Sequence, residues 1–370
     1  MGAFRHAGLR VGAWVAAQRL GVQWALLLAL SLIFVAVLEL PRLPAALLLG
    51  PMVAGIAMAM TECRLHVPRR LFYLAQGVVG CLIARALPLS IFGEMAHDWP
   101  IFLGGVLSVI VVSAFLGWLL TRWQVLPGTT ALWGSSPGGA SAVVIMSEAY
   151  GADFRLVAFM QYLRVAMVAV LASTVAAYFS LGASRPPIDW LPPVHWLSFA
   201  ETLALIVGGA VVGRVLRIPA GPMMVPLFAG VLLQAIGLMT IELPPWLLAI
   251  SYAGIGWSIG LRFTRGILVH AARALPRVLA ATVALIVLCC GLAAVLVAVA
   301  GVDPLTAYLA TSPGGADAVA IIATSSNVDV PFVMAMQAAR VIVVLAMAPS
   351  LTRFIAKRMT ARQAQAASND

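Results

Sequence analysis

Ser-Pro-Gly-Gly occurs twice in this chain, and each copy is followed by a glutamine and an arginine within apolar sequence. A guanidinium group offers carboxylate and phosphate oxygens a planar fork of donors, and a helix start exposes amides that favour an anion. The two sets stand 176 positions apart and form the predicted site for an anionic substrate: Ser136, Pro137, Gly138, Gly139, Gln161 and Arg164 in the first, and Ser312, Pro313, Gly314, Gly315, Gln337 and Arg340 in the second.

Proline and glycine in each set predict that an apolar helix breaks there and exposes unpaired amides and carbonyls. Arg164 follows Asp153 by eleven residues, so at about 1.5 Å per residue it lies about 16 Å deep, close to the middle of a bilayer core. Three readings of the arginines stay open: they bind substrate, they satisfy the opened carbonyls, or they pair with Glu148 and Asp317. Likewise, the helix break serves either ligand binding or packing.

Asp317 breaks the duplication, because the equivalent position in the first half is Ser141. A carboxylate on one side only of a two-fold site is suited to carry a coupling proton or to bind sodium. Asp317 and Glu148, two of the few acidic residues in apolar segments, are therefore the predicted ion-coupling residues. An ion pair between Asp317 and either arginine is the alternative.

The composition is that of a protein that spans a membrane several times. Of the 370 residues, 62% are hydrophobic and 10% are charged, and the mean hydropathy is +1.03. Several segments exceed the roughly 18 apolar residues of a spanning helix. The formal net charge of +10 comes from basic clusters between apolar segments, as the positive-inside rule predicts, so it does not indicate a nucleic-acid partner. The predicted fold class is an all-α polytopic membrane protein whose main partner is the lipid bilayer.

The duplication extends over two whole halves of the chain. Proline-rich sequence between the halves cannot continue a helix and reads as a linker. The predicted organisation is a cytoplasmic N-terminal segment at 1–20, a first membrane repeat at 21–183, the linker at 184–195, a second membrane repeat at 196–352 and a cytoplasmic tail at 353–370.

Small residues also recur between the halves. Gly80, Ile83 and Ala84 are repeated as Gly256, Ile259 and Gly260. Small side chains let membrane helices approach closely, so we expect helix crossings at these positions and no chemistry.

The positions of Lys and Arg favour inverted halves. If the Ser-Pro-Gly-Gly segments enter and leave on one side, each half has five full spans, and eighteen of the 23 basic residues lie in the cytoplasm, three outside and two within helices. If all twelve apolar segments span, twelve lie inside and nine outside, which is a weak bias. The first arrangement predicts two tips that meet near the midplane, with both termini cytoplasmic. The count does not separate a re-entrant hairpin from a broken crossing helix.

Enzyme signatures are missing from the sequence. The five histidines are scattered, with no His-x-x-x-His pair or Glu-x-x-His repeat, and no Gly-x-x-x-x-Gly-Lys loop is present to bind a nucleotide. We expect no enzymatic activity and therefore no catalytic residue, metal or cofactor.

The motif pair resembles the AbrB family of bacterial integral membrane proteins. The resemblance is carried by Ser-Pro-Gly-Gly-Ala-Ser-Ala-Val at 136–143, Ser-Pro-Gly-Gly-Ala-Asp-Ala-Val at 312–319 and Gln-x-x-Arg-Val at 161–165 and 337–341, and it covers nearly the whole chain. It implies a multi-pass protein of the bacterial cytoplasmic (inner) membrane. Family members are commonly labelled as ammonia monooxygenases or as regulators, and the resemblance assigns no catalytic residues.

These observations predict a secondary transporter or exporter of a small organic anion, driven by H⁺ or Na⁺. The alternative is a membrane sensor that binds a metabolite at the same site and affects gene expression through a partner, and the third reading is the monooxygenase of the family label. Direct nucleic-acid binding is not expected, because no soluble segment is long enough for a helix-turn-helix. The oligomeric state stays open, with a homodimer among the options.

Overall fold

The computed structural model describes residues 14–40, 45–87, 93, 97–123, 130–136, 147, 152–179, 189–216, 218, 221–272, 274–340 and 343. Within these ranges the chain is built from helices and contains no strand, which confirms the predicted all-α class. Of the predicted site, Pro137, Gly138, Gly139 and Glu148 lie outside the described residues, and only the backbone of Asp317 is described.

The described helices are α2 (Leu20–Glu39), α3 (Ala46–Met60), α4 (Arg69–Ala86), α6 (Trp99–Arg122), α7 (Thr130–Ser135), α9 (Phe154–Phe179), α10 (Trp196–Val215), α11 (Gly221–Ala235), α12 (Pro245–Gly260), α13 (Arg265–Ala271), α14 (Leu275–Ala300), α15 (Pro304–Thr311) and α16 (Ala316–Thr324). A further helix covers residues 330–340. Five helices, α2, α6, α9, α10 and α14, are long and apolar enough to cross a membrane. The protein is therefore polytopic, as its composition predicts.

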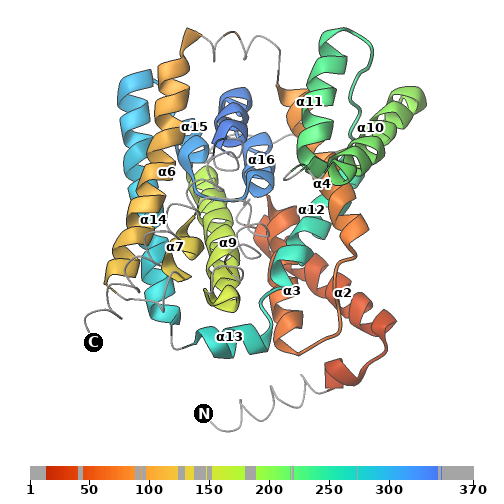
Figure 1. The fold of residues 1–370 in the computed structure, drawn as a ribbon. Helices are drawn as coiled ribbons and strands as arrows, with labels where there is room; N and C mark the ends of the chain where they lie inside the picture. The colour runs from red at the N-terminus through yellow and green to blue at the C-terminus, as the bar shows by residue number, and fades with distance from the viewer. Residues whose placement is uncertain are drawn as a thin grey trace.

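The helices form two groups that stand side by side (Figure 1). In the first, which we call the scaffold group, α3 packs on α2 and α12, and α4 packs on α10, α11 and α12. In the second, the hairpin group, α14 packs on α6, α9 and α15, and α9 packs also on α7 and α16. Each group takes helices from both halves of the sequence. The short helix α13 joins the groups along the lower end of the view in Figure 1.

Glycines mark the crossings within the scaffold group. A Cβ added to Gly80 on α4 would lie 2.3 Å from the carbonyl oxygen of Met223 on α11. One added to Gly256 on α12 would lie 2.5 Å from the carbonyl oxygen of Leu48 on α3. The prediction that these small residues permit close helix packing is confirmed, and the two crossings use equivalent positions of the two halves.

Gly256→Ala is expected to destabilise the protein by about 1–3 kcal/mol, because the new methyl group would meet backbone atoms that cannot move aside. Gly291→Ala is the matched control: it lies in the spanning helix α14, where an added Cβ meets nothing within 4 Å. Thermal melting of both variants in detergent measures the difference. Equal melting temperatures would contradict the proposed role of Gly256.

The second Ser-Pro-Gly-Gly sequence breaks a helix, as predicted. Pro313 and the two following glycines separate α15 from α16. Asp303 begins α15, and its carboxylate accepts hydrogen bonds from the amides of Leu305 and Thr306 at 3.0 Å. After α16 the amide of Asp329 donates to Thr306 Oγ1 at 3.1 Å, so the segment returns to the end at which α15 began. The segment therefore runs as a hairpin and does not cross from one end to the other.

The first half repeats this contact. Asp153, just before α9, donates from its amide to Oγ1 of Thr130, the first residue of α7, at 3.3 Å. Asp153 also contacts His270 of α13, which precedes α14, whereas Thr306 and Asp329 lie just beyond the other end of α14. Since α14 has 26 residues, its ends are about 39 Å apart. α9 and the helix at 330–340 therefore start at opposite ends of α14, as Figure 1 also shows.

Candidate functional site

Arg164 and Gln161 bind the carbonyls at the end of α7. Arg164 Nη1 donates to the carbonyl oxygen of Ser136 at 3.0 Å and to that of Ser135 at 3.4 Å. Gln161 Nε2 donates to the carbonyl oxygens of Trp133 and Ser136, both at 3.0 Å. The two side chains are joined by a hydrogen bond of 2.7 Å from Arg164 Nη2 to Gln161 Oε1. They therefore satisfy carbonyls that the end of α7 leaves without helical partners.

The second half repeats the same scheme at the end of α15. Arg340 Nη1 donates to the carbonyl oxygen of Ser312 at 2.6 Å, and Nη2 donates to that of Gly314 at 3.0 Å. Gln337 Nε2 donates to the carbonyl oxygens of Leu309 at 2.8 Å and Ser312 at 3.4 Å, while its Oε1 accepts from Arg340 Nη2 at 2.5 Å. The partners Leu309 and Ser312 stand 176 positions after Trp133 and Ser136. Both arginines thus bind opened carbonyls, one of the three readings that the sequence left open.

Both guanidinium groups are buried positive charges. Arg164 and Arg340 are each 4% exposed, and both glutamines are fully buried. Among the residues that the structure describes, the Nε–H of each arginine has no hydrogen-bond partner. Within the described part of the chain, neither guanidinium contacts a carboxylate; the ion pairs there join Arg265 to Glu62 and His270 to Asp153 instead. A buried charge is costly unless an opposite charge lies nearby, so these two groups favour a negative charge beside them.

The two arginine clusters approach each other across α9 and α14. A Cβ added to Gly314 would lie 2.9 Å from Cγ1 of Val168, which is one helical turn beyond Arg164 on α9. On α14, Thr311 Oγ1 reaches the carbonyl oxygen of Cys289 at 3.3 Å. One to two turns earlier, α14 contributes Thr282 and Leu285 to a cavity beside Arg164. The middle of α14 therefore lies between the two broken segments.

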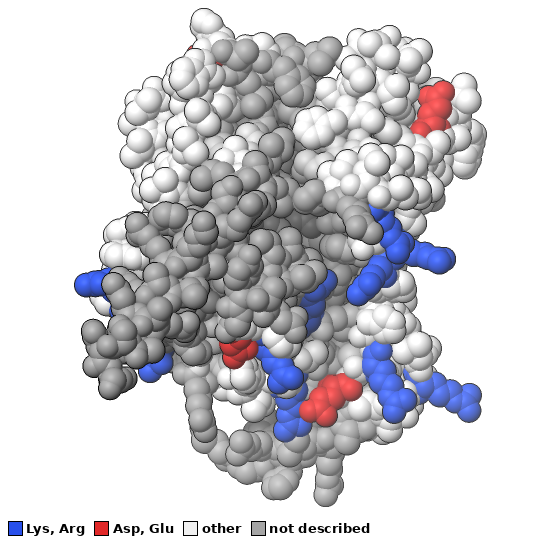
Figure 2. Space-filling view, in the orientation of Figure 1, with Lys and Arg blue, Asp and Glu red and all other residues white. Residues whose placement is uncertain are grey.

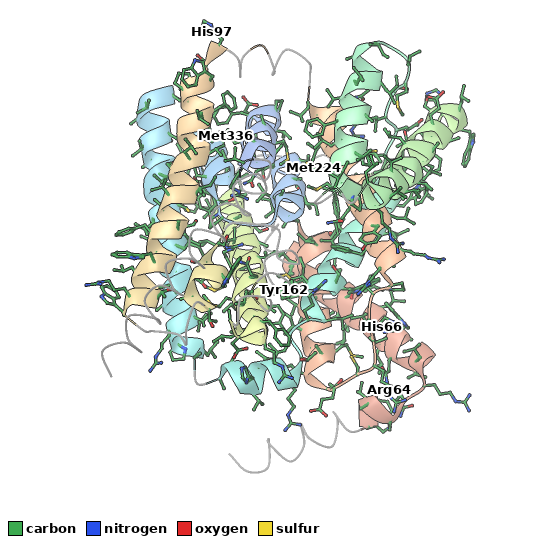
Figure 3. The ribbon with its side chains drawn as sticks, viewed as in Figure 1. Arg64, His66, His97, Tyr162, Met224 and Met336 are labelled. Carbon is green, nitrogen blue, oxygen red and sulfur yellow. The ribbon has the colours of Figure 1, made fainter. Side chains whose placement is uncertain are left out.

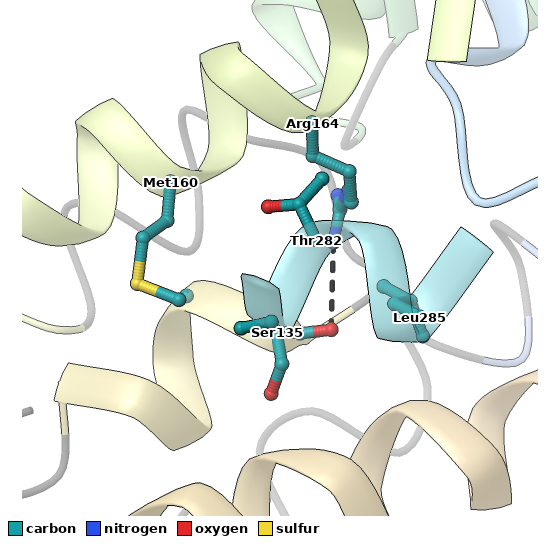
Figure 4. A pocket seen from close by; sticks show the side chains of 7 residues that line it. Ser135, Met160, Arg164, Thr282 and Leu285 are labelled. Carbon is teal, nitrogen blue, oxygen red and sulfur yellow. Dashed lines mark hydrogen bonds between the residues drawn. The ribbon is translucent and has the colours of Figure 1, made fainter. Parts of the chain in front are cut away.

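A small cavity adjoins the first arginine (Figure 4). Its walls come from α7, α9 and α14, and its lining residues are Gly134, Ser135, Met160, Arg164, Ala281, Thr282 and Leu285. The dashed line in Figure 4 is the bond from Arg164 to the Ser135 carbonyl. Apart from the arginine and two hydroxyl side chains, the walls are apolar, and the space is about that of one water molecule.

Aspartates fix the start of the helices that carry the arginines. Asp153 Oδ1 accepts from the amides of Arg155 and Leu156, and Asp329 Oδ1 accepts from the amide of Phe332 at 3.0 Å. Partial burial disfavours the charged form of Asp153. Hydrogen bonds from His270 and from the helix amides, together with the charge of His270, favour the charged form more strongly than burial disfavours it. The pKa of Asp153 therefore lies below its ordinary value.

Several residues of the site were not predicted from the sequence. Thr130 and Thr306, which bind the amides of Asp153 and Asp329, are themselves 176 positions apart, so the repeat spacing would have revealed them. Ser135 and Thr282 carry no such signal, because Thr282 reaches the cavity only through the packing of α14 on α7 and α9. The predicted site residues that the structure describes lie together in the two clusters.

Comparison with known proteins assigns the family. A family model described as "Transition state regulatory protein AbrB" matches residues 47–356. The chain belongs to the AbrB family. It is 47% identical over 346 residues to the Escherichia coli (strain K12) protein named "Putative regulator AbrB", an alignment that covers 93% of this chain and 99% of that protein. It is also 25% identical over 311 residues to the Bacillus subtilis (strain 168) "Uncharacterized protein YhjN", covering 78% of this chain and 79% of that protein. No solved structure matches this AbrB-family chain.

Proposed function

We propose that this AbrB-family protein is a secondary transporter or exporter of a small organic anion across the bacterial cytoplasmic membrane. The observation that carries the proposal is the pair of buried guanidinium groups, each with an Nε–H that meets no acceptor within the described part of the chain. Arginine binds carboxylates through charge-assisted N–H donors, and here the Nε–H is held in place because the Nη atoms already donate to Gln161 or Gln337 and to the opened carbonyls. In this proposal a substrate carboxylate accepts from Nε and places a negative charge beside the guanidinium groups.

The arrangement of the broken helices supports transport over simple binding. Two hairpins that start at opposite ends and meet near the middle are the usual way in which inverted repeats build a substrate site. The inverted relation of the halves is part of this proposal. It is supported by the opposite starting ends of α9 and of the helix at 330–340, and by the equivalent hydrogen bonds of the two arginines.

Coupling to H⁺ or Na⁺ is assigned in this proposal to Asp317 and Glu148. The backbone of Asp317 lies in the first turn of α16, directly after the broken segment. In this proposal a carboxylate close to the bound substrate anion changes its affinity for a proton or sodium when the substrate arrives, because the two negative charges interact at short range.

The orientation proposed is that the end with α13 faces the cytoplasm, together with both termini. On the face shown in Figure 2, the described Lys and Arg side chains lie in the middle and lower parts, toward the end with α13. The positive-inside rule places such an end in the cytoplasm.

Cysteine labelling checks this orientation. Gly266→Cys, in α13, is expected to react with an impermeant thiol reagent only from the cytoplasmic side, and Asn327→Cys, exposed between α16 and Asp329, only from outside. The parent protein, with its four free cysteines, measures the background reaction. Labelling of both positions from one side would contradict the orientation and the inverted halves.

Uptake and counterflow in liposomes test transport itself. Purified protein is reconstituted and screened with labelled mono- and dicarboxylates, with an imposed H⁺ or Na⁺ gradient and without one. Counterflow of one anion class that empty liposomes lack supports the proposal. Saturable binding in detergent without any counterflow would favour the alternative, a membrane sensor that affects gene expression through a partner, which the word "regulator" in the name of the E. coli relative also suggests.

The monooxygenase reading is tested by metal content. The described residues contain no group of three or more His, Cys, Asp or Glu that could hold a metal ion. We therefore expect elemental analysis of the purified protein to find no stoichiometric iron or copper, because a preformed ligand set is missing. A reproducible ratio near one metal per chain would favour the oxidase and count against transport.

A further inference from the structure

The connector between α12 and α14 contacts one face of α9 at three points. We call residues 261–272, which include α13, the α13 connector. The guanidinium of Arg262 lies 4.6 Å from the ring centroid of Tyr162 and also donates from Nη1 to its hydroxyl. The ring of Phe263 meets that of Phe159 edge to face, with 6.1 Å between the centroids. These contacts follow the first half of α9, because Phe159 and Tyr162 are three residues apart and share a face.

The third contact reaches the start of α9. His270 Nε2 lies 2.6 Å from Oδ2 of Asp153, while the other oxygen of that carboxylate caps the helix. Tyr162 is the residue between Gln161 and Leu163 on the helix that carries Arg164, and it faces the end of α12 (Figure 3). The α13 connector is thus bound directly to the helix whose arginine forms the candidate site.

The same connector is anchored to the scaffold group. It continues from the end of α12, and Arg265 in α13 lies 3.6 Å from Glu62, just past the end of α3. The α13 connector therefore joins the scaffold group to the hairpin group in two ways, through the covalent chain and through its side-chain contacts. Both links lie at the end of the molecule where α13 is found. Separation of the groups at this end requires these contacts to break.

The polar contacts are suited to reversible opening. The side chains of the His270–Asp153 pair are 43% and 29% exposed, and those of the Arg265–Glu62 pair are 48% and 64% exposed. Water-exposed ion pairs contribute little each, so these two pairs break at low cost. The contact of Phe263 with Phe159 is buried and apolar, and it is the contact that opening has to separate at the largest cost.

We infer that the α13 connector is a latch that closes one end of the path to Arg164 while it binds α9. When Tyr162 and Asp153 separate from the connector, the cavity beside Arg164 opens toward that end. The latch rests on the proposed transport function, because a transporter must open its site to one side at a time. Thr282 is the reporter position, since it lines the cavity and lies seven residues, about 10 Å, into α14 from the end next to α13.

Two substitutions open the latch without removing a cap or a ring. Tyr162→Phe loses the hydroxyl that accepts from Arg262, and Asp153→Asn keeps an oxygen for the helix amides but loses the charge that faces His270. Asp329→Asn is the matched control, because it makes the same change at the aspartate that caps the helix at 330–340. The backbone amide of Asp329 contacts Thr306 on α15 and not the α13 connector. Each is combined with Thr282→Cys in the full chain, in vesicles that expose the α13 end to the reagent.

The rate of modification of the Thr282→Cys thiol by a small impermeant reagent is the measurement, with the same variant lacking Thr282→Cys as background. We expect the Tyr162→Phe, Asp153→Asn double variant to react roughly fivefold faster than the parent, and Asp329→Asn to react at the parental rate. An unchanged rate in the double variant, or an equal rise in Asp329→Asn, overturns the latch. If the double variant does not fold, Tyr162→Phe alone is used, since it keeps the ring contacts.

The labelling result does not depend on transport. A rate increase in the double variant together with no counterflow in the parent would leave the latch standing and refute the transport proposal. Counterflow in the parent together with an unchanged labelling rate in the double variant would support the transport proposal and refute the latch.

Discussion

Arg164→Lys and Arg340→Lys are each expected to weaken binding of a carboxylate substrate by roughly 100-fold or more, while the protein remains folded. Lysine keeps the charge, but it has neither the planar fork nor enough fixed donors to serve the hairpin carbonyls, the glutamine oxygen and a ligand together. Affinity is measured by titration of the anion found in the liposome screen, at a temperature well below the melting of each variant.

Arg69→Lys, at the exposed start of α4, is the control for a general effect of the substitution. Because each guanidinium also donates to opened carbonyls, both site variants are expected to melt at a somewhat lower temperature than the control. Wild-type affinity combined with a loss of thermal stability would show that the arginines are structural only. The amides at the start of α16 would then be the remaining candidates for the anion.

Gln337→Leu is expected to lower the free energy of unfolding by roughly 3 kcal/mol or more. Leucine fills a similar volume, but the carbonyls of Leu309 and Ser312 lose a buried donor and Arg340 Nη2 loses one of its two acceptors. Gln161→Leu is expected to have a similar effect, because its amide serves the equivalent carbonyls of the first half.

Gln234→Leu is the matched control for these two variants. Its amide makes a single part-buried hydrogen bond of 3.0 Å to the carbonyl of Ala84, so its replacement is expected to cost about 1 kcal/mol. Thermal melting in detergent compares the three variants under one condition. If all three melted alike, the glutamines would not hold the hairpins, and the orientation of the arginines would need another explanation.

The structural role of each arginine is compatible with the proposed binding of substrate. The Nη atoms tie the end of a broken helix to the helix that carries the arginine, whereas the Nε–H has no acceptor among the described residues. A substrate that binds at Nε would therefore bind to a group already fixed in place by the hairpin. Since little side-chain entropy remains to be lost, such preorganisation favours affinity.

The sequence by itself determined the class of the protein, the two-fold repetition and the residues worth examining. Long apolar segments specify spanning helices, Pro-Gly-Gly breaks a helix wherever it stands, and an arginine deep in such a segment must find partners. These consequences are local, because they follow from the composition of one segment and from the solvent around it. The same repeat spacing also pairs Thr130 with Thr306 and Asp153 with Asp329, although their contacts are visible only in the structure.

The tertiary structure alone decided which partners the arginines have. Several acceptors compete for a guanidinium, and the choice depends on distances between segments that are 25–29 residues apart in the chain. The tertiary structure also decided that the segment from α15 to α16 turns back on itself. The count of Lys and Arg on each side of the membrane is the same for a hairpin and for a broken crossing helix if another segment fails to span. The contacts between α9 and the α13 connector join residues 100 or more positions apart, and side-chain packing across such a separation has no signature in local sequence.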